Sequence, residues 1–218
     1  MKKIVISLFV LAVTFTACKD SGKKVETKEA QEVEIVKEAE TVTYSTVKEG
    51  SELKWRASHL AGAGARFGKT KLQIGKVLLN NNKITNAKFI IDLGSLTVDN
   101  FDDAEQKGKL EGHLKSADFF NIEKFPTARF EITKVEENKG DYNSLITGNL
   151  TILETTKSIT FNANIAVLAN SVAINSEDFS VNRQDWELNY HSEGDAGVPT
   201  DYLIADAIGF TINVALTK

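Results

Sequence analysis

Three histidines, His59, His113 and His191, are the side chains of this sequence best suited to proton transfer or metal binding. Their spacing matches no zinc motif, because the H-x-x-x-H and H-E-x-x-H patterns are absent from the sequence. The sequence also lacks the G-x-S-x-G turn that presents a catalytic serine. We therefore predict no metal site and no catalytic residue, with an enzyme that uses His59 or His113 as proton carrier kept as an alternative.

A glycine cluster formed by Gly62, Gly64 and Gly68 has the composition of a phosphate-binding loop. Such loops place G-x-G-x-x-G between a strand and a helix. Here the spacing is different, and the following residues 71–74 alternate as a strand does. The cluster is therefore interpreted as a hairpin or a loop at the mouth of a barrel.

The elements that must position these residues are mostly strands, because apolar residues recur with a period of two. The alternating sets are Leu53, Trp55, Ala57, His59; Ala87, Phe89, Ile91, Leu93; Ile159, Phe161, Ala163, Ile165; and Ile208, Phe210, Ile212, Val214, Leu216. Turn residues separate such runs at 80–82, 138–141, 154–157 and 170–171. With only two prolines in the chain, this pattern favours an all-β, up-and-down sheet closed on itself.

Two segments depart from this alternation. Residues 101–120 space their apolar side chains by three, four or six after an acidic start, which predicts one helical insertion. Ser116 is expected to cap a turn with Phe119 and Phe120 buried, before Pro126 starts a strand in which Ala128, Phe130 and Ile132 alternate. Residues 184–206 have no clean period and are predicted to form a long loop that controls access to an interior.

The run Gly112–Phe130 resembles the YceI-like family, whose "HL.S.DFF......P...F" pattern it matches. The resemblance extends to Trp55 and His59, to residues 148–152 with the following Thr155 and Thr156, and to Arg183, Trp186 and Tyr190. It implies an eight-stranded antiparallel, lipocalin-like barrel over residues 44–218 that holds a polyisoprenoid, an isoprenoid quinone or a similar long-chain lipid. Alternation alone cannot tell such a hollow barrel from a filled one, since both use the same residues.

The resemblance and the alternation together indicate which side chains face the interior or the mouth. These are Trp55, His59, Phe67, Phe89, Ile91, His113, Leu114, Phe119, Phe120, Phe130, Ile132, Phe161, Arg183, Trp186, Tyr190 and Phe210. Among them Arg183 is the most natural contact for a phosphate or quinone oxygen. A structural ion pair between Arg183 and Asp185 or Glu187 is an equally good interpretation.

The N-terminus has the pattern of a bacterial lipoprotein signal. Lys2 and Lys3 precede an apolar run over 4–13, and Cys18 follows small residues. The apolar run is too short for a membrane-spanning helix. We predict a signal peptide over 1–17, acylation of Cys18, the only cysteine, and a charged flexible tether over 18–43 with a reach of about 25 to 30 Å. The protein would then be anchored to a bacterial membrane in the cell envelope, on the periplasmic side or at the cell surface.

The charge of the chain excludes one class of partner. The net charge is −4 and becomes −6 once Lys2 and Lys3 are removed with the signal, so nucleic acid is not expected as a partner. The leading hypothesis is a membrane-tethered carrier or storage protein for a long-chain lipid, with no cofactor other than that lipid. The alternatives are an enzyme acting on a lipid head group and a structural or interaction module with a filled core, and edge strands would allow a homodimer.

Overall fold

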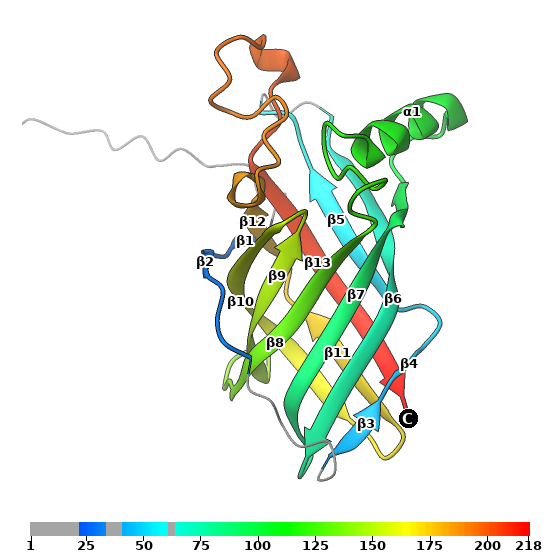
Figure 1. Ribbon diagram of the computed structural model, residues 1–218, viewed down its shortest axis with the longest axis vertical. Coiled ribbons are helices and arrows are strands. Elements are labelled where there is room, and N and C mark those ends of the chain that lie inside the picture. The colour runs from blue at the N-terminus through cyan, green and yellow to red at the C-terminus, as the bar shows by residue number, and fades with distance from the viewer. Residues whose placement is uncertain (1–21, 34–40, 61–63) are drawn as a thin grey trace, which may run out of the picture.

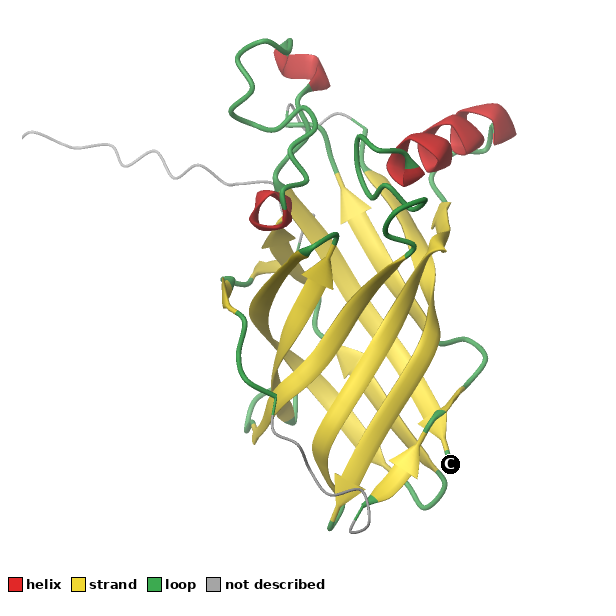
Figure 2. Cartoon of the chain, in the orientation of Figure 1, coloured by secondary structure: helices red, strands yellow, loops and turns green. Residues whose placement is uncertain are grey.

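The computed structural model describes residues 22–33, 41–60 and 64–218, and shows an antiparallel β-barrel with one α-helix at one end (Figures 1 and 2). The barrel strands are β3 (Val42–Tyr44), β4 (Thr46–Val47), β5 (Glu52–Ala57), β6 (Arg66–Asn80), β7 (Lys83–Val98), β8 (Thr127–Glu137), β9 (Ser144–Ile152), β10 (Thr155–Val167), β11 (Ser171–Ser176), β12 (Phe179–Asn182) and β13 (Ala207–Thr217). The remaining elements are the short strands β1 (Lys23–Lys24) and β2 (Lys28–Glu29), helix α1 (Ala104–Lys115) and the 3₁₀ turns η2 (Arg183–Trp186) and η3 (Thr200–Tyr202).

The sheet closes because β13 returns to the first strand. Consecutive strands pair antiparallel from β5 to β11, and Phe210 of β13 lies opposite Trp55 of β5. The segments β3, β4 and β5 act as one interrupted strand. The segments β11 and β12 act as a second interrupted strand, and both pair with β13. Counted in this way the barrel has eight strands, which confirms the predicted fold.

The hairpin turns follow the polar residues of the sequence. Asn81 and Asn82 both have positive φ, 50° and 61°, as expected for a tight turn between β6 and β7. The turn between β9 and β10 is centred on Leu153 and Glu154, since Thr155 already pairs with Ile152. The predicted turn over 154–157 was therefore placed too far along the chain.

Helix α1 is shorter than the predicted insertion over 101–120. Asp103 caps its start by accepting a hydrogen bond from the Gln106 amide at 2.8 Å, and the helix ends at Ser116. The Ser116 hydroxyl also accepts from the Asp118 amide at 3.3 Å, so the expected capping role is present. Phe119 and Phe120 are only half-buried, not buried as predicted, because they lie at the open end of the barrel.

The end of the barrel opposite α1 is closed by packed side chains. Val77, Ala87, Val172 and Leu216, from β6, β7, β11 and β13, have no exposed surface. Their strands converge there with β3 and β4, at the lower end of Figure 1. The barrel therefore has one closed end and one end covered by α1 and loops, which we call the mouth.

Residues 22–33, called the strap, lie against the outer wall between β12 and β10. β1 pairs in parallel with Phe179 and Ser180 of β12, and β2 pairs antiparallel with Lys157 and Ser158 of β10. Within the described chain no ladder joins β10 directly to β12, so the strap bridges the gap between their edges.

Side-chain contacts add to these backbone bonds. Val25 is only 7% exposed and packs on the core, and Thr27 donates to Asp185 at 2.6 Å. This part of the predicted tether is thus docked, because backbone pairing and one apolar side chain outweigh its polar composition. Residues 34–40 of that tether, like the signal segment and Cys18, lie outside the described residues.

Candidate ligand-binding cavity

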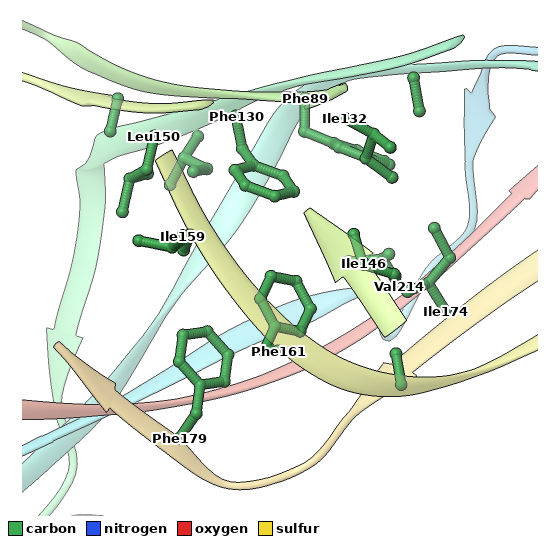
Figure 3. Packing of buried hydrophobic residues seen from close by; sticks show 14 of the residues in the cluster. Phe89, Phe130, Ile132, Ile146, Leu150, Ile159, Phe161, Ile174, Phe179 and Val214 are labelled. Atoms are coloured by element: carbon green, nitrogen blue, oxygen red, sulfur yellow. The ribbon is translucent and has the colours of Figure 1, made fainter. Parts of the chain in front are cut away.

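The barrel is hollow. A cavity of about 370 Å³ extends from the mouth into the interior, lined almost entirely by apolar side chains from every long strand. Its inner part lies between Ile146 of β9, Ile174 of β11 and Val214 of β13, beyond which the packed closed end begins. Figure 3 shows side chains from different strands pointing toward this common interior. A barrel of eight strands is the size that holds one small ligand.

A row of phenylalanines crosses one side of the cavity. Phe161 of β10 stacks on Phe179 of β12 with ring centroids 4.6 Å apart and planes within 4° of each other. Phe130 and Phe210 extend this row at 5.8 and 6.0 Å on its two sides. The stacked pair spans the β10–β12 gap from inside, while the strap covers it from outside.

The residues predicted from the sequence to face the interior or the mouth line the cavity, with one exception, and their contact with a ligand stays a prediction. Lining residues among them are Trp55, His59, Phe89, Ile91, His113, Leu114, Phe119, Phe120, Phe130, Ile132, Phe161, Arg183, Trp186, Tyr190 and Phe210. Phe67 does not line the cavity and is 45% exposed. It lies opposite Arg56, whereas Trp55 lies opposite Gly68, so the alternation of the ladder turns Phe67 outward.

The mouth is narrowed by an aromatic cluster that joins two elements far apart in the sequence. His113 of α1 contacts Phe119 and Tyr190 edge-on, with centroid distances of 5.1 and 4.8 Å. Tyr190 also stacks on His191 at 3.9 Å, and His113 lies 3.1 Å from Asp118 through Nε2. The predicted long loop over 184–206, which begins within η2 and contains η3, therefore meets the α1 segment over the cavity.

Arg183, the first residue of η2, is buried, and its guanidinium holds the long loop in place. Nε and Nη2 donate to the carbonyls of Ala205 and Ile204 at 3.3 and 3.1 Å, and Nη1 donates to that of Leu188. Burial lowers the pKa of Arg183, while Asp206, whose Oδ1 is 3.4 Å from Nη2, raises it in part. Its ion pair is therefore with Asp206, not with Asp185 or Glu187. With its donors directed at carbonyls, Arg183 positions the loop, and a head-group contact by this residue is not favoured.

Trp186 forms part of the inner wall below this loop. It has no exposed surface, and its indole Nε1 donates to the Leu150 carbonyl at 3.0 Å. Arg183 and Trp186, two of the residues that carry the resemblance to the YceI-like family, thus both fix η2 and the long loop to the barrel. Their role at the cavity is to shape its wall.

Among the described residues, His59 carries the one fully buried side-chain nitrogen or oxygen atom without a hydrogen-bond partner, and this residue lines the cavity. Its Nδ1 is buried and accepts or donates no hydrogen bond in that part of the chain. The His59 backbone bridges to Ile204 at the mouth. An unpaired buried nitrogen costs free energy, so a polar group of a ligand is a natural partner for it.

All three histidines line the cavity near its mouth, a convergence that their sequence spacing did not indicate. Among the described residues no group of three or more His, Cys, Asp or Glu is placed to hold a metal ion. The imidazoles are instead separated between the β5 end, α1 and the long loop.

Several lining residues were not among those predicted from the sequence, although some of them lie in runs whose alternation was recognised. These are Leu72, Leu93, Leu96, Ile146, Leu150, Ile152, Ile159, Ile174, Phe179, Val181, Ile208, Ile212 and Val214, with Leu188, Tyr202 and Ile204 from the long loop. The alternation of residues 208–214 is visible in the sequence and predicts that Ile208, Ile212 and Val214 share the inner face. For the loop residues no local signal exists, because their position depends on Arg183.

A hollow antiparallel β-barrel with an apolar interior defines the lipocalin-like class of small-ligand binders. Comparison with known families narrows this class: the YceI-like domain matches residues 44–216, and the chain therefore belongs to that family.

Curated proteins from two bacteria are similar to this chain. The chain is 31% identical over 128 residues to a UPF0312 protein of Pseudomonas putida and 34% identical over 127 residues to one of Shewanella baltica. These matches cover 58% and 57% of this chain and 63% of each relative, so the chain spans under two thirds of their length.

Two solved structures share the fold. BcnA of Burkholderia cenocepacia has a TM-score of 0.58 at 18% identity, covering 77% of this chain and 96% of that one. A polyisoprenoid binding domain from Saccharophagus degradans, implicated in plant cell wall breakdown, has a TM-score of 0.56 at 12% identity, covering 81% of this chain and 99% of that one.

No helix in the described part of the chain is long and apolar enough to cross a bilayer.

Proposed function

We propose that this protein binds one long-chain apolar lipid, of the polyisoprenoid or isoprenoid quinone type, in the barrel cavity. The observation that carries the proposal is the hollow interior of about 370 Å³ with its apolar lining from β5 to β13. A polyisoprenoid-binding domain with the same fold supports this ligand class. Among the described residues, those that line the inner part of the cavity, such as Ile146, Ile174 and Val214, are apolar, so a linear hydrocarbon fits it best.

The binding free energy would come from the hydrocarbon tail. Each buried carbon contributes about 0.8 kcal/mol, so one five-carbon isoprene unit contributes about 4 kcal/mol. Three or four units exceed the cost of ordering the ligand and give a stable complex. Affinity is therefore expected to depend more on tail length than on the head group.

The head group would lie at the mouth, near the unpaired Nδ1 of His59 and the aromatic cluster around Tyr190. This location keeps a polar group within reach of water while the tail is buried. We expect His59 to orient the ligand and to perform no chemistry. With Cys18 acylated, the protein would act as a membrane-tethered carrier or storage protein in the cell envelope.

The test uses residues 19–218, purified without the signal segment and without Cys18. Lipids extracted from the native preparation are identified by mass spectrometry, and the emptied protein is then titrated with polyprenols of increasing length. A bound lipid must raise the melting temperature, because a ligand at one hundred times its Kd stabilises the native state by about 2.7 kcal/mol. A preparation that contains no lipid and shows no thermal shift with any polyprenol would refute the proposal in favour of a structural module.

A further inference from the structure

The beginning of the strap is fixed to the barrel wall at one place. The Lys23 amide donates to the Asp178 carbonyl at 3.0 Å, and the Val25 amide donates to the Ser180 carbonyl at 2.8 Å. Gly22 has φ of +76°, and a Cβ there would lie 2.7 Å from the Asp178 carbonyl carbon. Only glycine tolerates both that conformation and that approach. The described chain therefore starts in contact with the β11–β12 bend.

This attachment point lies in the half of the barrel next to the mouth. The Asp178 carboxylate accepts from Thr211 of β13 and lies 3.4 Å from the Arg56 guanidinium of β5. Arg56 is the penultimate residue of β5, and the chain beyond Ala57 leads directly to His59 at the mouth. About three residues of strand, or about 10 Å, separate Gly22 from the rim.

The rim of the mouth carries exposed apolar side chains. Leu60, Phe67 and Tyr202 are 40%, 45% and 63% exposed. Leu60 and Tyr202 are neighbours, since the Leu60 amide donates to the carbonyl of Leu203 at 2.8 Å. Phe67 lies opposite Arg56 at the end of the β5–β6 ladder. Val42 and Leu168, at the closed end, are also 45% and 64% exposed, so exposed apolar surface alone does not distinguish the two ends of the barrel, and the attachment of Gly22 must discriminate between them.

The chain between Cys18 and Gly22 sets a short upper limit on the distance to an acyl anchor. Four residues span at most about 14 Å when fully extended. This is half the reach of a free tether over 18–43, because the strap has taken residues 22–33 onto the barrel. An acyl group on Cys18 is therefore kept near the mouth and away from the closed end.

We propose that the docked strap turns the mouth of the barrel toward the membrane, with Leu60, Phe67 and Tyr202 resting on the lipid surface. The proposal rests on the anchored lipid carrier described above and adds its orientation. A lipid would then pass between bilayer and cavity without crossing water. Glu193, Asp195 and Asp201 are exposed in the mouth loop, so anionic head groups would repel the mouth, and the surface that it contacts is that of a zwitterionic bilayer.

The experiment compares the two ends of the acylated full-length protein in phosphatidylcholine vesicles. Thr200→Cys places a fluorescent label in η3 at the mouth, and Ala169→Cys places the same label in the β10–β11 turn at the closed end. Both positions are exposed, and an acylated Cys18 does not react with the label. A nitroxide quencher on the lipid acyl chain, close to the head group, should quench the label at 200 and leave the label at 169 bright.

A third variant tests the strap directly. Inserting about twelve Gly/Ser residues between Ser21 and Gly22 lengthens the free chain to about 20 Å or more while leaving the strap docked. The selective quenching at position 200 should then be lost.

Two results would contradict the inference, and they differ in what else they affect. If the protein floats with the vesicles but both labels are quenched equally, or only the label at 169 is, the orientation is wrong and the anchor stands. If the protein does not float with the vesicles, the anchor and the orientation both fail, while lipid binding by the soluble chain is judged by its own titration.

Discussion

Replacing Ile174 by tryptophan should shorten the lipid that the cavity accepts. Ile174 lies on β11, is 3% exposed, and faces Ile146 and Val214 in the inner part of the cavity (Figure 3). The larger indole would occupy space equivalent to about one isoprene unit, five carbons at about 0.8 kcal/mol each, or about 4 kcal/mol. A tail that filled the cavity would therefore lose up to about a thousandfold in affinity.

The measurement is a series of titrations with polyprenols that differ by one unit, followed by tryptophan fluorescence or thermal shift. For Ile174→Trp the preferred length should fall by about one unit, with affinity for the shortest ligands nearly unchanged. The matched control is Asn175→Trp, one residue along β11 on the exposed outer face. It should retain the length preference of the unmodified protein.

Folding of the variant is checked separately, since inserting atoms into a packed core costs about 1 to 3 kcal/mol. Here the indole enters empty space, so the melting temperature of the lipid-free protein should stay the same or rise. A folded Ile174→Trp variant that binds the longest polyprenols as tightly as before would show that the lipid does not occupy the inner cavity, and the reasoning would fail.

Four further outcomes are expected. Arg183→Met should destabilise the fold by about 3 kcal/mol in urea unfolding, because it leaves the carbonyls of Leu188, Ile204 and Ala205 without a side-chain donor and removes the cation beside Asp206; a loss below 1 kcal/mol would contradict the role given to Arg183. His59→Gln should change lipid affinity less than tenfold, whereas an enzyme acting through this residue would lose turnover altogether. Lys157 donates a hydrogen bond to the Glu29 carboxylate, which raises the pKa of Lys157, so strap docking should be complete below a pH of about 10.4 and weaken as the pH rises above it; strap proteolysis that does not increase at alkaline pH would refute this. Deleting residues 22–33 exposes the edges of β10 and β12 and should promote dimers, detected by light scattering.

The strands were predictable because alternation reports which side chains share a face, and Leu53, Trp55 and Ala57 do line the cavity together. The error at Phe67 shows the limit of that signal. Which face of β6 points inward depends on its register with β5, a long-range property that alternation in a single strand does not contain. Gly68 marks this register: a Cβ there would lie 1.8 Å from the Thr97 carbonyl oxygen and 3.0 Å from the Trp55 indole, so only glycine fits opposite Trp55.

The docked strap could not be predicted for a different reason. Its composition is that of a solvated linker, and the interactions that hold it are long-range, such as the mutual bonds of 2.6 and 2.8 Å between Asn149 and the Gln31 backbone. The polarity of a segment indicates only how much free energy the segment gains by burying its side chains. Backbone pairing with an open strand edge adds stability without any apolar signature.

The cavity, the strap and the mouth loop all depend on one bend in the wall. At Glu177 the β11–β12 strand leaves β10, and the Glu177 carboxylate accepts the Asn162 amide at 2.8 Å in place of a ladder partner. Beyond the bend, β12 carries η2 inward so that Trp186 reaches the Leu150 carbonyl and walls the cavity. The same departure leaves two unpaired edges, which the strap occupies. A barrel without this bend would pair β10 with the β11–β12 strand along its whole length, which would leave no open edges for the strap and no docking site for Gly22 in the half of the barrel next to the mouth.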